Sequence, residues 1–511
     1  MQEMRTVLVA NRGEIACRVF RTCRALGLET VAVYSDADAS ALHVREADAA
    51  VRLPGNAAAD TYLRGDLVIG AAVAAGADAV HPGYGFLSEN AEFARAVLAA
   101  GLVWIGPPPS AIEAMASKTR AKKLMAEAGV PLLAPLEGEA VSPDAFPDAF
   151  PVLVKAAAGG GGRGMRVVRA PEELPGALKS ARAEALAAFG DDEVFVEPYV
   201  EGGRHVEVQV LADAHGGVWT LGTRDCSLQR RHQKVIEEAP APYLSEDARD
   251  TLTRSAAAAA RAVGYVGAGT VEFLVGQDGR PYFLEMNTRL QVEHPVTECV
   301  YGVDLVALQL RIAEGLRLDD EPPRPTGHAV EARLYAEDPR RDWAPWAGEV
   351  HELSLEPGGR VRVDAGVAAG DTVTVHYDPL LAKVIAWAPT RTEATRRLTH
   401  ALERARVHGP VTNRSLLVRS LRHPDFAAGR VDTTFYERHL AELTEPEDEG
   451  EALRLAALIA ALADASTERG TRPVRGAGNC APSPHRPADE EHRGIPQRIG
   501  GWRNLPSVPQ T

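Results

Sequence analysis

The sequence predicts an α/β protein of several domains, in which a parallel sheet comes first and antiparallel strands follow. A chain of 511 residues is too long for one hydrophobic core and favours two to four domains. Near the N-terminus, strand and helix patterns alternate as a βαβ unit, which favours a parallel sheet covered by helices. Further on, an Asp-Gly pair between two apolar runs is typical of an antiparallel hairpin.

Composition narrows the class of function. The hydrophobic content of 45% and charged content of 25% are ordinary for a globular protein. A net charge of −14 argues against a nucleic-acid partner, because neutralising phosphates requires a basic surface. No apolar run reaches the ~18 residues that cross a bilayer, so we expect no membrane segment. Five scattered cysteines without CxxC spacing indicate reduced thiols and a cytoplasmic location.

The first predicted unit consists of a strand at 6–10, a helix at 13–27 and a strand at 30–36. Its first turn reads Asn-Arg-Gly-Glu-Ile instead of G-x-G-x-x-G, which disfavours NAD binding. The loop at 81–90 combines two glycines and a serine before a helix. It is either a helix-capping turn or a binding loop at the carboxyl end of a strand.

Four consecutive glycines at 159–162 separate two apolar strands. No Walker A motif is present, so the run is either a hairpin tip or a lid whose N–H groups bind phosphate. Lys155 ends the preceding strand, where its ammonium can reach a phosphate. The chain has seven lysines and forty-nine arginines, so its lysines are enriched at sites that need a compact ammonium. The basic run at 224–234 is either a solvated face or an anion-binding channel.

The hairpin at 271–287 carries one carboxylate on each strand. With Asp278 and Gly279 as turn residues, Leu274 pairs with Phe283 and Glu272 pairs with Glu285. Opposed like charges destabilise a sheet, so either a divalent cation or a protonated carboxyl must be present. Alternation places Glu285, Asn287, Arg289, Gln291 and Glu293 on one face, which is either a solvated edge or a site. Glu272, Glu285 and Asn287 offer the hard oxygen ligands that Mg²⁺ prefers.

Five segments of the chain resemble the biotin carboxylase family of ATP-grasp enzymes, colinearly from about residue 5 to about residue 440. They read ANRGEIACRVFRTCRALG, HPGYGFLSEN, GGGGRGMRVV, RDCSLQRRHQKVIEEAP and FLEMNTRLQVEHPVTE. The resemblance implies a Rossmann-like N-terminal domain (1–117), an ATP-grasp domain (118–318, lid about 128–200) and a C-terminal biotin carboxylase lobe (325–441). Residues 446–511 are expected to form a helix and a disordered linker.

The same resemblance implies MgATP-dependent carboxylation of biotin by bicarbonate through carboxyphosphate, with Mg²⁺ or Mn²⁺ as the metal. It assigns the metal to Glu272, Glu285 and Asn287, and bicarbonate to Lys234, Arg289 and Val292. Glu293 is the implied base, Arg289 the catalytic arginine, and Arg362 the group that stabilises the enolate oxygen of biotin. The implied ATP contacts, besides the two metal-binding glutamates, are Lys118, Lys155, Gly161, Gly162, Glu197, Pro198, Tyr199, Val200, His205 and His232.

The chain departs from the family pattern at Pro198, where a lysine is common, and at Ala158, where a glycine is common. It contains no Met-Lys dipeptide for biotin attachment, so we expect biotin on a separate carrier protein or domain. A carboxyltransferase subunit and a homodimer are the other expected partners, as in the α chain of an acyl-CoA carboxylase. Two alternatives are another ATP-grasp ligase, such as one making carbamoyl phosphate or a peptide bond, and a regulatory nucleotide sensor.

Overall fold

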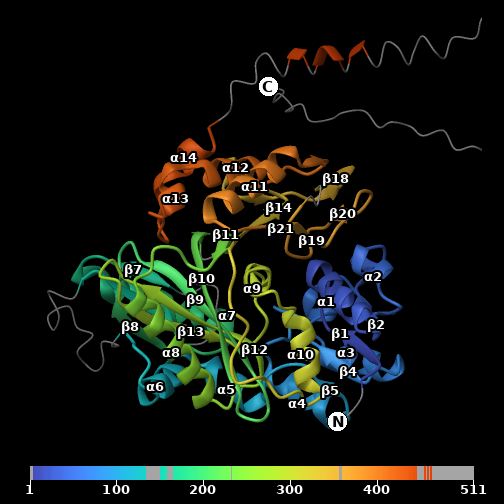
Figure 1. Cartoon of the computed structure of the whole chain (residues 1–511), viewed down its shortest axis with the longest axis horizontal. Helices are drawn as coiled ribbons and strands as arrows, with labels where there is room; N and C mark the ends of the chain where they lie inside the picture. The colour runs from blue at the N-terminus through green and yellow to red at the C-terminus, as the bar shows by residue number, and fades with distance from the viewer. Residues whose placement is uncertain are drawn as a thin grey trace, which may run out of the picture. The chain divides into compact units, whose positions relative to one another are not determined.

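The computed structural model describes residues 4–133, 150–157, 165–231, 233–355 and 359–445, and seven helical residues between 454 and 462. The chain divides into two compact units, Met1–Thr444 and Glu445–Thr511 (Figure 1). In the second unit the described residues are 454–455, 457–459 and 461–462, and they expose Leu455, Leu458, Ile459 and Leu462. The rest of the predicted linker lies outside the described residues.

The first unit begins with the predicted parallel sheet, so the βαβ interpretation is confirmed. All four of its strand pairings are parallel, in the order β3-β2-β1-β4-β5. The strands are β1 (Thr6–Val9), β2 (Glu29–Tyr34), β3 (Ala49–Arg52), β4 (Ala79–His81) and β5 (Val103–Trp104). The helices of this region are α1 (Gly13–Ala25), α2 (Leu42–Glu46), α3 (Gly65–Ala74), α4 (Ala91–Ala99) and α5 (Pro109–Ala116), with short turns η1 (Asp36–Asp38) and η2 (Ala58–Asp60).

Helix α1 joins this sheet to the later part of the chain. Its apolar residues Ile15, Val19, Phe20 and Cys23 recur at helical spacing and are buried in one core with β1 and β2. The helix also contacts β19 (Val361–Ala365) and β21 (Leu380–Ala388). These contacts bring helix α1, near the start of the chain, next to strands that lie beyond residue 360 in the sequence.

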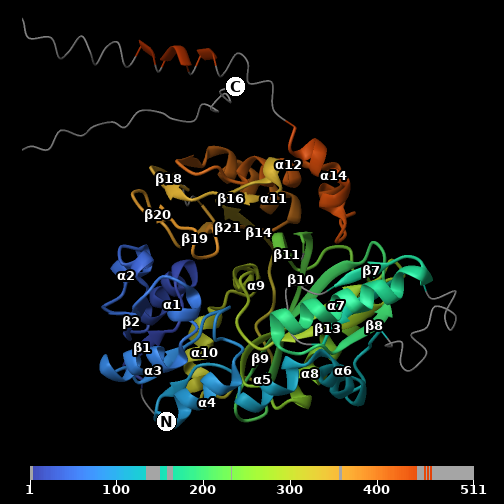
Figure 2. The same ribbon diagram turned by 180° about the vertical axis from the view of Figure 1, so that it is seen from behind.

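A small antiparallel sheet, in the order β7-β6-β8, follows in the chain. Its strands are β6 (Val152–Ala156), β7 (Arg166–Val168) and β8 (Val194–Pro198), and helix α7 (Leu174–Phe189) covers one face (Figure 2). Helix α6 (Lys118–Glu127) precedes it, and the turn η3 (Pro171–Glu173) leads into α7. The glycine run at 159–162 connects β6 to β7 and lies outside the described residues.

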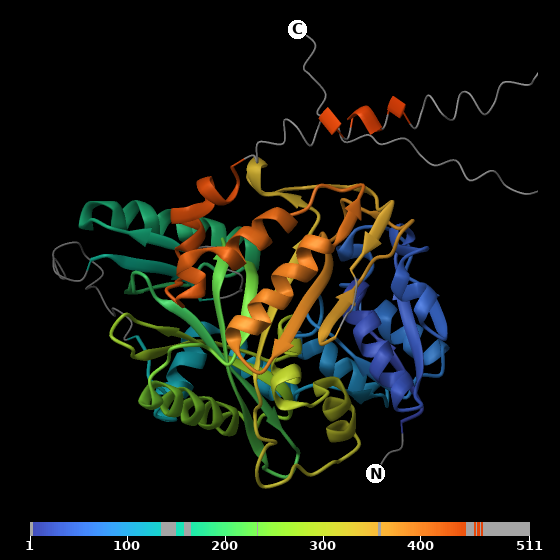
Figure 3. The ribbon, with the colours of Figure 1, turned by 45° about the horizontal axis from the view of Figure 1, so that its top comes forward.

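An eight-stranded antiparallel sheet forms the centre of the unit, in the order β13-β12-β9-β10-β11-β14-β21-β19. Besides β19 and β21, its strands are β9 (Arg204–Ala212), β10 (Val218–Arg230), β11 (Gln233–Ala239), β12 (Gly267–Val275), β13 (Pro281–Asn287) and β14 (His328–Tyr335). Helix α8 (Glu246–Ala262) packs on β9, β10, β12 and β13, and α11 (Arg391–Arg404) lies along β14 and β21 (Figure 3). Helix α9 (His294–Tyr301) contacts β10, β11, β14 and β21.

Strand β9 shows why polar groups collect on one face of this sheet. Val206, Val208 and Val210 pack in the core beneath α8, whereas the alternate residues His205 and Glu207 point to the opposite face. All five side chains are buried. A strand that is buried on both faces but polar on one requires ionic partners on the polar side.

The hairpin of β12 and β13 confirms one predicted pairing and corrects the other. Glu272 pairs with Glu285 as predicted, but Leu274 pairs with Tyr282 instead of Phe283. Gly276 pairs with Arg280, so the turn has three residues, 277–279, instead of two. Gly279 ends the turn with a φ of 78°. A bulge between the Glu272 pair and the Phe273–Phe283 pair restores the register of the glutamates.

The remaining described elements complete the first unit. Helices α10 (Leu305–Ala313), α12 (Arg414–Arg422), α13 (Pro424–Ala427) and α14 (Phe435–Leu443) and the turn η4 (Pro339–Arg341) lie between or after the strands. Three two-stranded sheets pair β15 (Glu337–Asp338) with β16 (Ala344–Pro345), β17 (Gly348–Glu349) with β20 (Thr372–Val373), and β18 (Glu352–Ser354) with β22 (Arg406–His408). Among the described residues, no helix has the length and apolarity needed to cross a membrane.

Candidate functional site

The polar face of the central sheet opens into a cavity of about 1800 Å³. Its wall also includes residues of the small sheet, of the parallel-sheet region and of the segment 372–381. Most of the predicted site residues line it, namely Lys118, Lys155, Glu197, Pro198, Tyr199, Val200, His205, Lys234, Glu272, Glu285, Asn287, Arg289 and Val292. Gly161, Gly162 and His232 lie outside the described residues.

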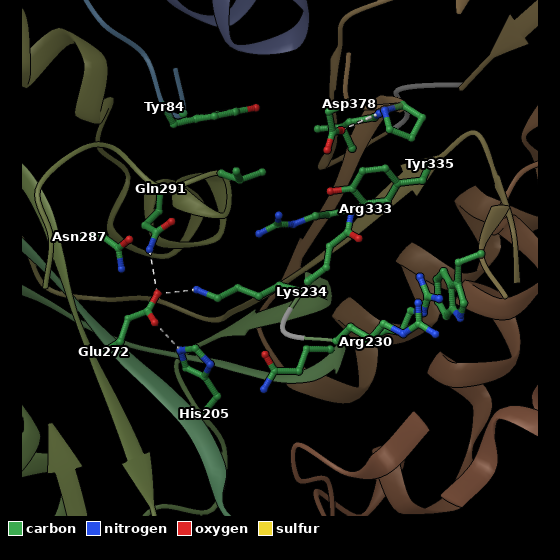
Figure 4. A pocket seen from close by; sticks show the side chains of 18 of the residues that line it. Tyr84, His205, Arg230, Lys234, Glu272, Asn287, Gln291, Arg333, Tyr335 and Asp378 are labelled. Atoms are coloured by element: carbon green, nitrogen blue, oxygen red, sulfur yellow. Dashed lines mark hydrogen bonds and ion pairs between the residues drawn. The ribbon is translucent and has the colours of Figure 1, made fainter. Parts of the chain in front are cut away.

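Glu272 is the carboxylate on which three side chains converge at this cavity. It accepts hydrogen bonds from Lys234 and Gln291, both at 3.0 Å, and its other oxygen lies 3.1 Å from His205 Nε2 (Figure 4). Burial raises the pKa of Glu272, but Lys234 and His205 outweigh it and hold the pKa well below the usual range. Glu272 is therefore ionised at neutral pH.

The pKa of Glu285, which opposes Glu272 across the hairpin, is shifted in the opposite direction. Desolvation and the neighbouring charge of Glu272 raise its pKa, and the ammonium of Lys118 only partly offsets them. Asn287 lies two residues further on; its Oδ1 accepts from Arg289, and its Nδ2 has no hydrogen-bond partner among the described residues. Two carboxylates and an amide oxygen thus meet at the cavity, and the repulsion between the two carboxylates is not offset. This donor set fits Mg²⁺ or Mn²⁺, because a divalent cation turns the repulsion of the glutamates into attraction.

Lys234 carries its ammonium into a ring of three carboxylates. Its Nζ lies 2.6 Å from Glu207, 2.5 Å from Glu293 and 3.0 Å from Glu272. Burial lowers the pKa of Lys234, but these carboxylates raise it well above the usual value. The same contact, together with Arg333, keeps the pKa of Glu293 well below its usual range despite burial. Glu293 does not line the cavity itself but is one hydrogen bond from it through Lys234.

Arg289 lines the cavity and is held by three side-chain acceptors. Its Nε donates to Glu89 at 2.9 Å, its Nη1 to Gln291 at 2.9 Å and its Nη2 to Asn287 at 2.8 Å. Glu89 comes from the loop at 81–90. That loop also contains Asn90, which caps α4, and Tyr84, which lines the cavity. The capping interpretation is confirmed, and the role of the loop in binding stays a prediction.

A second cationic cluster lies at the small sheet. Lys122 and Lys155 both form ion pairs with the buried carboxylate of Glu197 on β8. These two lysines hold the pKa of Glu197 below its usual value although burial raises it. Lys118, at the start of α6, lies close enough to Glu285 for the two charges to interact. The ammoniums of Lys118 and Lys155 therefore lie at the cavity wall, where they can meet phosphate oxygens.

Arg362 is placed away from the cavity lining, in a separate ionic network. Its Nη1 donates to Glu298 at 2.7 Å and its Nη2 to Asp364 at 2.6 Å. Glu298 also accepts from Arg18 at 2.7 Å. These carboxylates raise the pKa of Arg362 although burial lowers it, so the guanidinium is permanently charged. Its contact with α9, which begins directly after Glu293, is the link between this network and the cavity.

The structure adds site residues that sequence reasoning missed. They are Glu89, Lys122, Glu207 and Arg333. Glu207 could have been found from the alternation of His, Glu and Gln with valines along β9. Arg224, part of the basic run, is fully buried and donates to Glu207 and Gln209, so it positions Glu207 rather than contacting a ligand. Cys226 is buried beside Glu293, and desolvation raises its pKa well above the usual value, which agrees with a structural role.

Comparison with known proteins agrees with this geometry. Family models described as biotin carboxylase N-terminal domain, carbamoyl-phosphate synthase L chain ATP-binding domain and biotin carboxylase C-terminal domain match residues 3–112, 117–321 and 331–438. The chain is 46% identical over 439 residues to a biotin carboxylase of Nostoc sp., covering 84% of this chain and 98% of the relative.

Two further comparisons extend this likeness. A mitochondrial methylcrotonoyl-CoA carboxylase subunit alpha of Dictyostelium discoideum is 49% identical over 449 residues, covering 86% of this chain. The chain spans 64% of the length of that relative. The solved biotin carboxylase domain dimer of Hydrogenobacter thermophilus 2-oxoglutarate carboxylase, in complex with MgADP, ADP and bicarbonate, superposes with a TM-score of 0.84. It is 42% identical, and the match covers 88% of this chain and all of that domain.

The fold, the cavity and these likenesses define an ATP-dependent carboxylase of the ligase class. Within that class, the chain belongs to the biotin carboxylase family.

Proposed function

We propose that this chain carboxylates carrier-bound biotin with bicarbonate and MgATP, as the first half-reaction of an acyl-CoA carboxylase. The observation that carries the proposal is the convergence of Lys234, Glu272 and Glu293 beside the opposed glutamate pair. That arrangement combines a metal-type carboxylate set and a fixed ammonium at one cavity with an ionised base one hydrogen bond away from it. The likeness to the methylcrotonoyl-CoA carboxylase subunit supports the acyl-CoA assignment.

Each group of residues has a proposed task. Lys118, Lys155 and the glycine run with Gly161 and Gly162 bind the phosphates, and Glu197 to Val200, His205 and His232 complete the ATP contacts. Glu272, Glu285 and Asn287 hold Mg²⁺ or Mn²⁺, which when bound neutralises charge on the nucleotide phosphates. Lys234, Arg289 and Val292 orient bicarbonate. Glu293, kept ionised by its low pKa, accepts the bicarbonate proton.

The chemical step follows from these positions. A bicarbonate oxygen attacks the γ-phosphorus of ATP, the bond to the β-phosphate oxygen breaks, and carboxyphosphate and ADP result. Little covalent work is required of the protein, because phosphoryl transfer depends mainly on positioning and charge stabilisation. The bond between the carboxyl carbon and the phosphate oxygen of carboxyphosphate then breaks, the biotin ring nitrogen takes the carboxyl group, and the departing phosphate takes the proton of that nitrogen. Arg362 stabilises the enolate oxygen of biotin in this step. Since Arg362 lies in a separate ionic network, we expect it to act on biotin rather than on ATP.

We propose the domain division 1–117, 118–318 and 325–441, which the matched spans 3–112, 117–321 and 331–438 support. We further propose a homodimer in the cytoplasm, together with a biotin carrier and a carboxyltransferase. The solved dimer of the related domain supports the oligomeric state. The buried free thiols of Cys17, Cys23 and Cys226 support a reducing compartment.

A carrier experiment tests the partner assignment. A tethered or docked carrier raises the local biotin concentration to about the millimolar range, whereas free biotin binds through its small ring system alone. We therefore expect a much higher kcat/KM for a biotinylated carrier domain than for free biotin, measured with and without residues 446–511. Equal values for the two substrates, or ADP release that does not depend on bicarbonate, would overturn the proposal.

A further inference from the structure

Besides the pairs that Glu272 forms with Glu285 and Glu207, a further pair of opposed glutamates lies in the central sheet, outside the cavity lining. Glu237 on β11 pairs directly with Glu331 on β14, and both side chains are 0% exposed. Directly opposed residues hold their Cβ atoms about 4.5–5.5 Å apart. Two buried carboxylates at this separation repel each other strongly unless a cation or a proton intervenes.

The hydrogen bonding of this pair is incomplete. Glu237 Oε1 accepts from Arg333 Nε at 2.5 Å, but Glu237 Oε2 and both oxygens of Glu331 have no hydrogen-bond partner among the described residues. Three buried carboxylate oxygens without a donor destabilise the folded protein. A single proton shared by the two carboxyls is carried by one of these oxygens and donated to a second, and it also removes the like-charge repulsion.

The surrounding cations are shared with other acceptors. Arg333 Nη2 donates to Glu293 at 3.0 Å, and Lys383 contacts Glu14 and the carbonyl of Val292, both at 2.8 Å. The charged and titratable groups that face the pair from the packed elements are Lys234, Arg333, Lys383, Glu293, Cys226, Cys299 and Tyr436. Desolvation raises the pKa of Glu331 well above its usual value and that of Glu237 to about 7, despite these cations.

We propose that Glu237 and Glu331 share one proton at neutral pH and that the pair, carrying a single negative charge, positions Arg333 against the base Glu293. Arg333 bridges Glu237 and Glu293. The negative charge on the Glu237–Glu331 pair therefore determines how strongly the guanidinium of Arg333 stabilises the ionised form of Glu293. Both glutamates are positioning residues that contact no substrate. The role of Glu293 rests on the proposed function, whereas the shared proton does not.

The first test uses Glu331→Gln, whose amide has the shape of a protonated glutamate and a permanent N–H donor. A carboxyl with a raised folded pKa loses stability as the pH rises from its unfolded pKa of about 4.3 towards the folded value. We expect the wild type to lose melting temperature relative to Glu331→Gln as the pH rises through this window. The matched control is Glu321→Gln at an exposed position, which should follow the wild type.

Infrared spectroscopy detects the proton directly. In D₂O at neutral pD, the wild type should show a carboxylic-acid carbonyl band that is absent from both Glu331→Gln and Glu237→Gln and retained in Glu321→Gln. Each variant alone should abolish the band, because the proton is shared by the two carboxyls. A band that both variants retain would overturn the proposal. So would a failure of Glu331→Gln to fold, or a stability loss that is equal at every pH, since either result means that Glu331 must be charged.

The pH profile of bicarbonate-dependent ADP release separates positioning from simple structural support. Glu237→Gln removes the carboxylate oxygen that accepts from Arg333 Nε, so Arg333 keeps only its hydrogen bond to the carboxylate of Glu293, which lowers the pKa of the base. We expect kcat to fall, the acid limb to move to lower pH and the KM for ATP to stay constant. An unmoved acid limb contradicts the positioning role. Absence of bicarbonate-dependent ADP release in the wild type would contradict the proposed function instead. The infrared result would still decide whether Glu237 and Glu331 share a proton.

Discussion

Two of the opposed glutamate pairs in the central sheet, Glu272 with Glu285 and Glu237 with Glu331, differ in their surroundings. Glu272 and Glu285 border a cavity, and Glu272 accepts hydrogen bonds from Lys234 and Gln291 and lies 3.1 Å from His205. Glu237 and Glu331 are sealed, and three of their four oxygens have no donor among the described residues. An opposed carboxylate pair therefore does not identify a metal site by itself. Access for a hydrated cation and neighbouring oxygen ligands decide whether a metal ion or a proton relieves the repulsion.

The largest expected effect comes from a substitution in the pair at the cavity, Glu272 and Glu285. Glu285→Gln removes a metal oxygen and should reduce bicarbonate-dependent ADP release at least about 100-fold, as when one charge-stabilising group is lost. Without Mg²⁺ the same change removes like-charge repulsion and should raise stability by about 0.2–1 kcal/mol. Turnover and melting temperature in EDTA are measured together. Near-normal turnover with a destabilised metal-free protein contradicts the metal assignment.

The next largest effect is expected at Arg362, which contacts neither the Glu272–Glu285 pair nor the Glu237–Glu331 pair but binds Glu298 and Asp364. Arg362→Lys retains a charge between Glu298 and Asp364 but loses the bidentate geometry. We expect carboxylation of biotin to fall much more than bicarbonate-dependent ADP release in the absence of biotin. The control is Arg21→Lys, because Arg21 also contacts Asp364 but is half exposed. Equal losses in the two assays would place Arg362 in the ATP reaction.

A smaller effect concerns the lysines that serve the nucleotide. Lys155→Arg replaces a compact ammonium with a larger planar group beside Glu197, and we expect the affinity for ATP to fall about tenfold, which is 1.4 kcal/mol. Lys179→Arg, at an exposed position, is the matched control and should bind ATP as the wild type does. The measurement is an ATP titration by calorimetry. Unchanged affinity in Lys155→Arg would show that the site needs only a positive charge.

The smallest effect is the pH dependence of the metal-free protein. The raised pKa of Glu285 means that its ionisation costs stability as the pH rises above about 4.3, the value for an unfolded glutamate. The advantage of Glu285→Gln in EDTA should therefore be absent near pH 4 and grow towards neutral pH. Saturating Mg²⁺ should abolish or reverse it. An advantage that is constant over this range contradicts the repulsion between the two glutamates.

The sequence predicted much of the site because its signals are local. A strand period of two and an Asp-Gly turn were enough to pair Glu272 with Glu285, although the turn has three residues and a bulge restores the register. Glu89, Lys122 and Arg333 were missed because their partners lie 200, 75 and 40 positions away in the chain. No local period reports such contacts. The pairing of Glu237 with Glu331 depends on the order of β11 and β14 in the sheet, which only the fold determines.

The most direct test of the account follows an oxygen atom. If bicarbonate attacks the γ-phosphorus, one of its oxygens forms a bond to phosphorus and remains there when the carboxyl group leaves. With ¹⁸O-labelled bicarbonate, ATP, Mg²⁺ and biotin, mass spectrometry should therefore find one labelled oxygen in each inorganic phosphate and none in ADP. Phosphate released without label, at a rate that does not depend on bicarbonate, would contradict the central claim that this cavity activates bicarbonate with ATP.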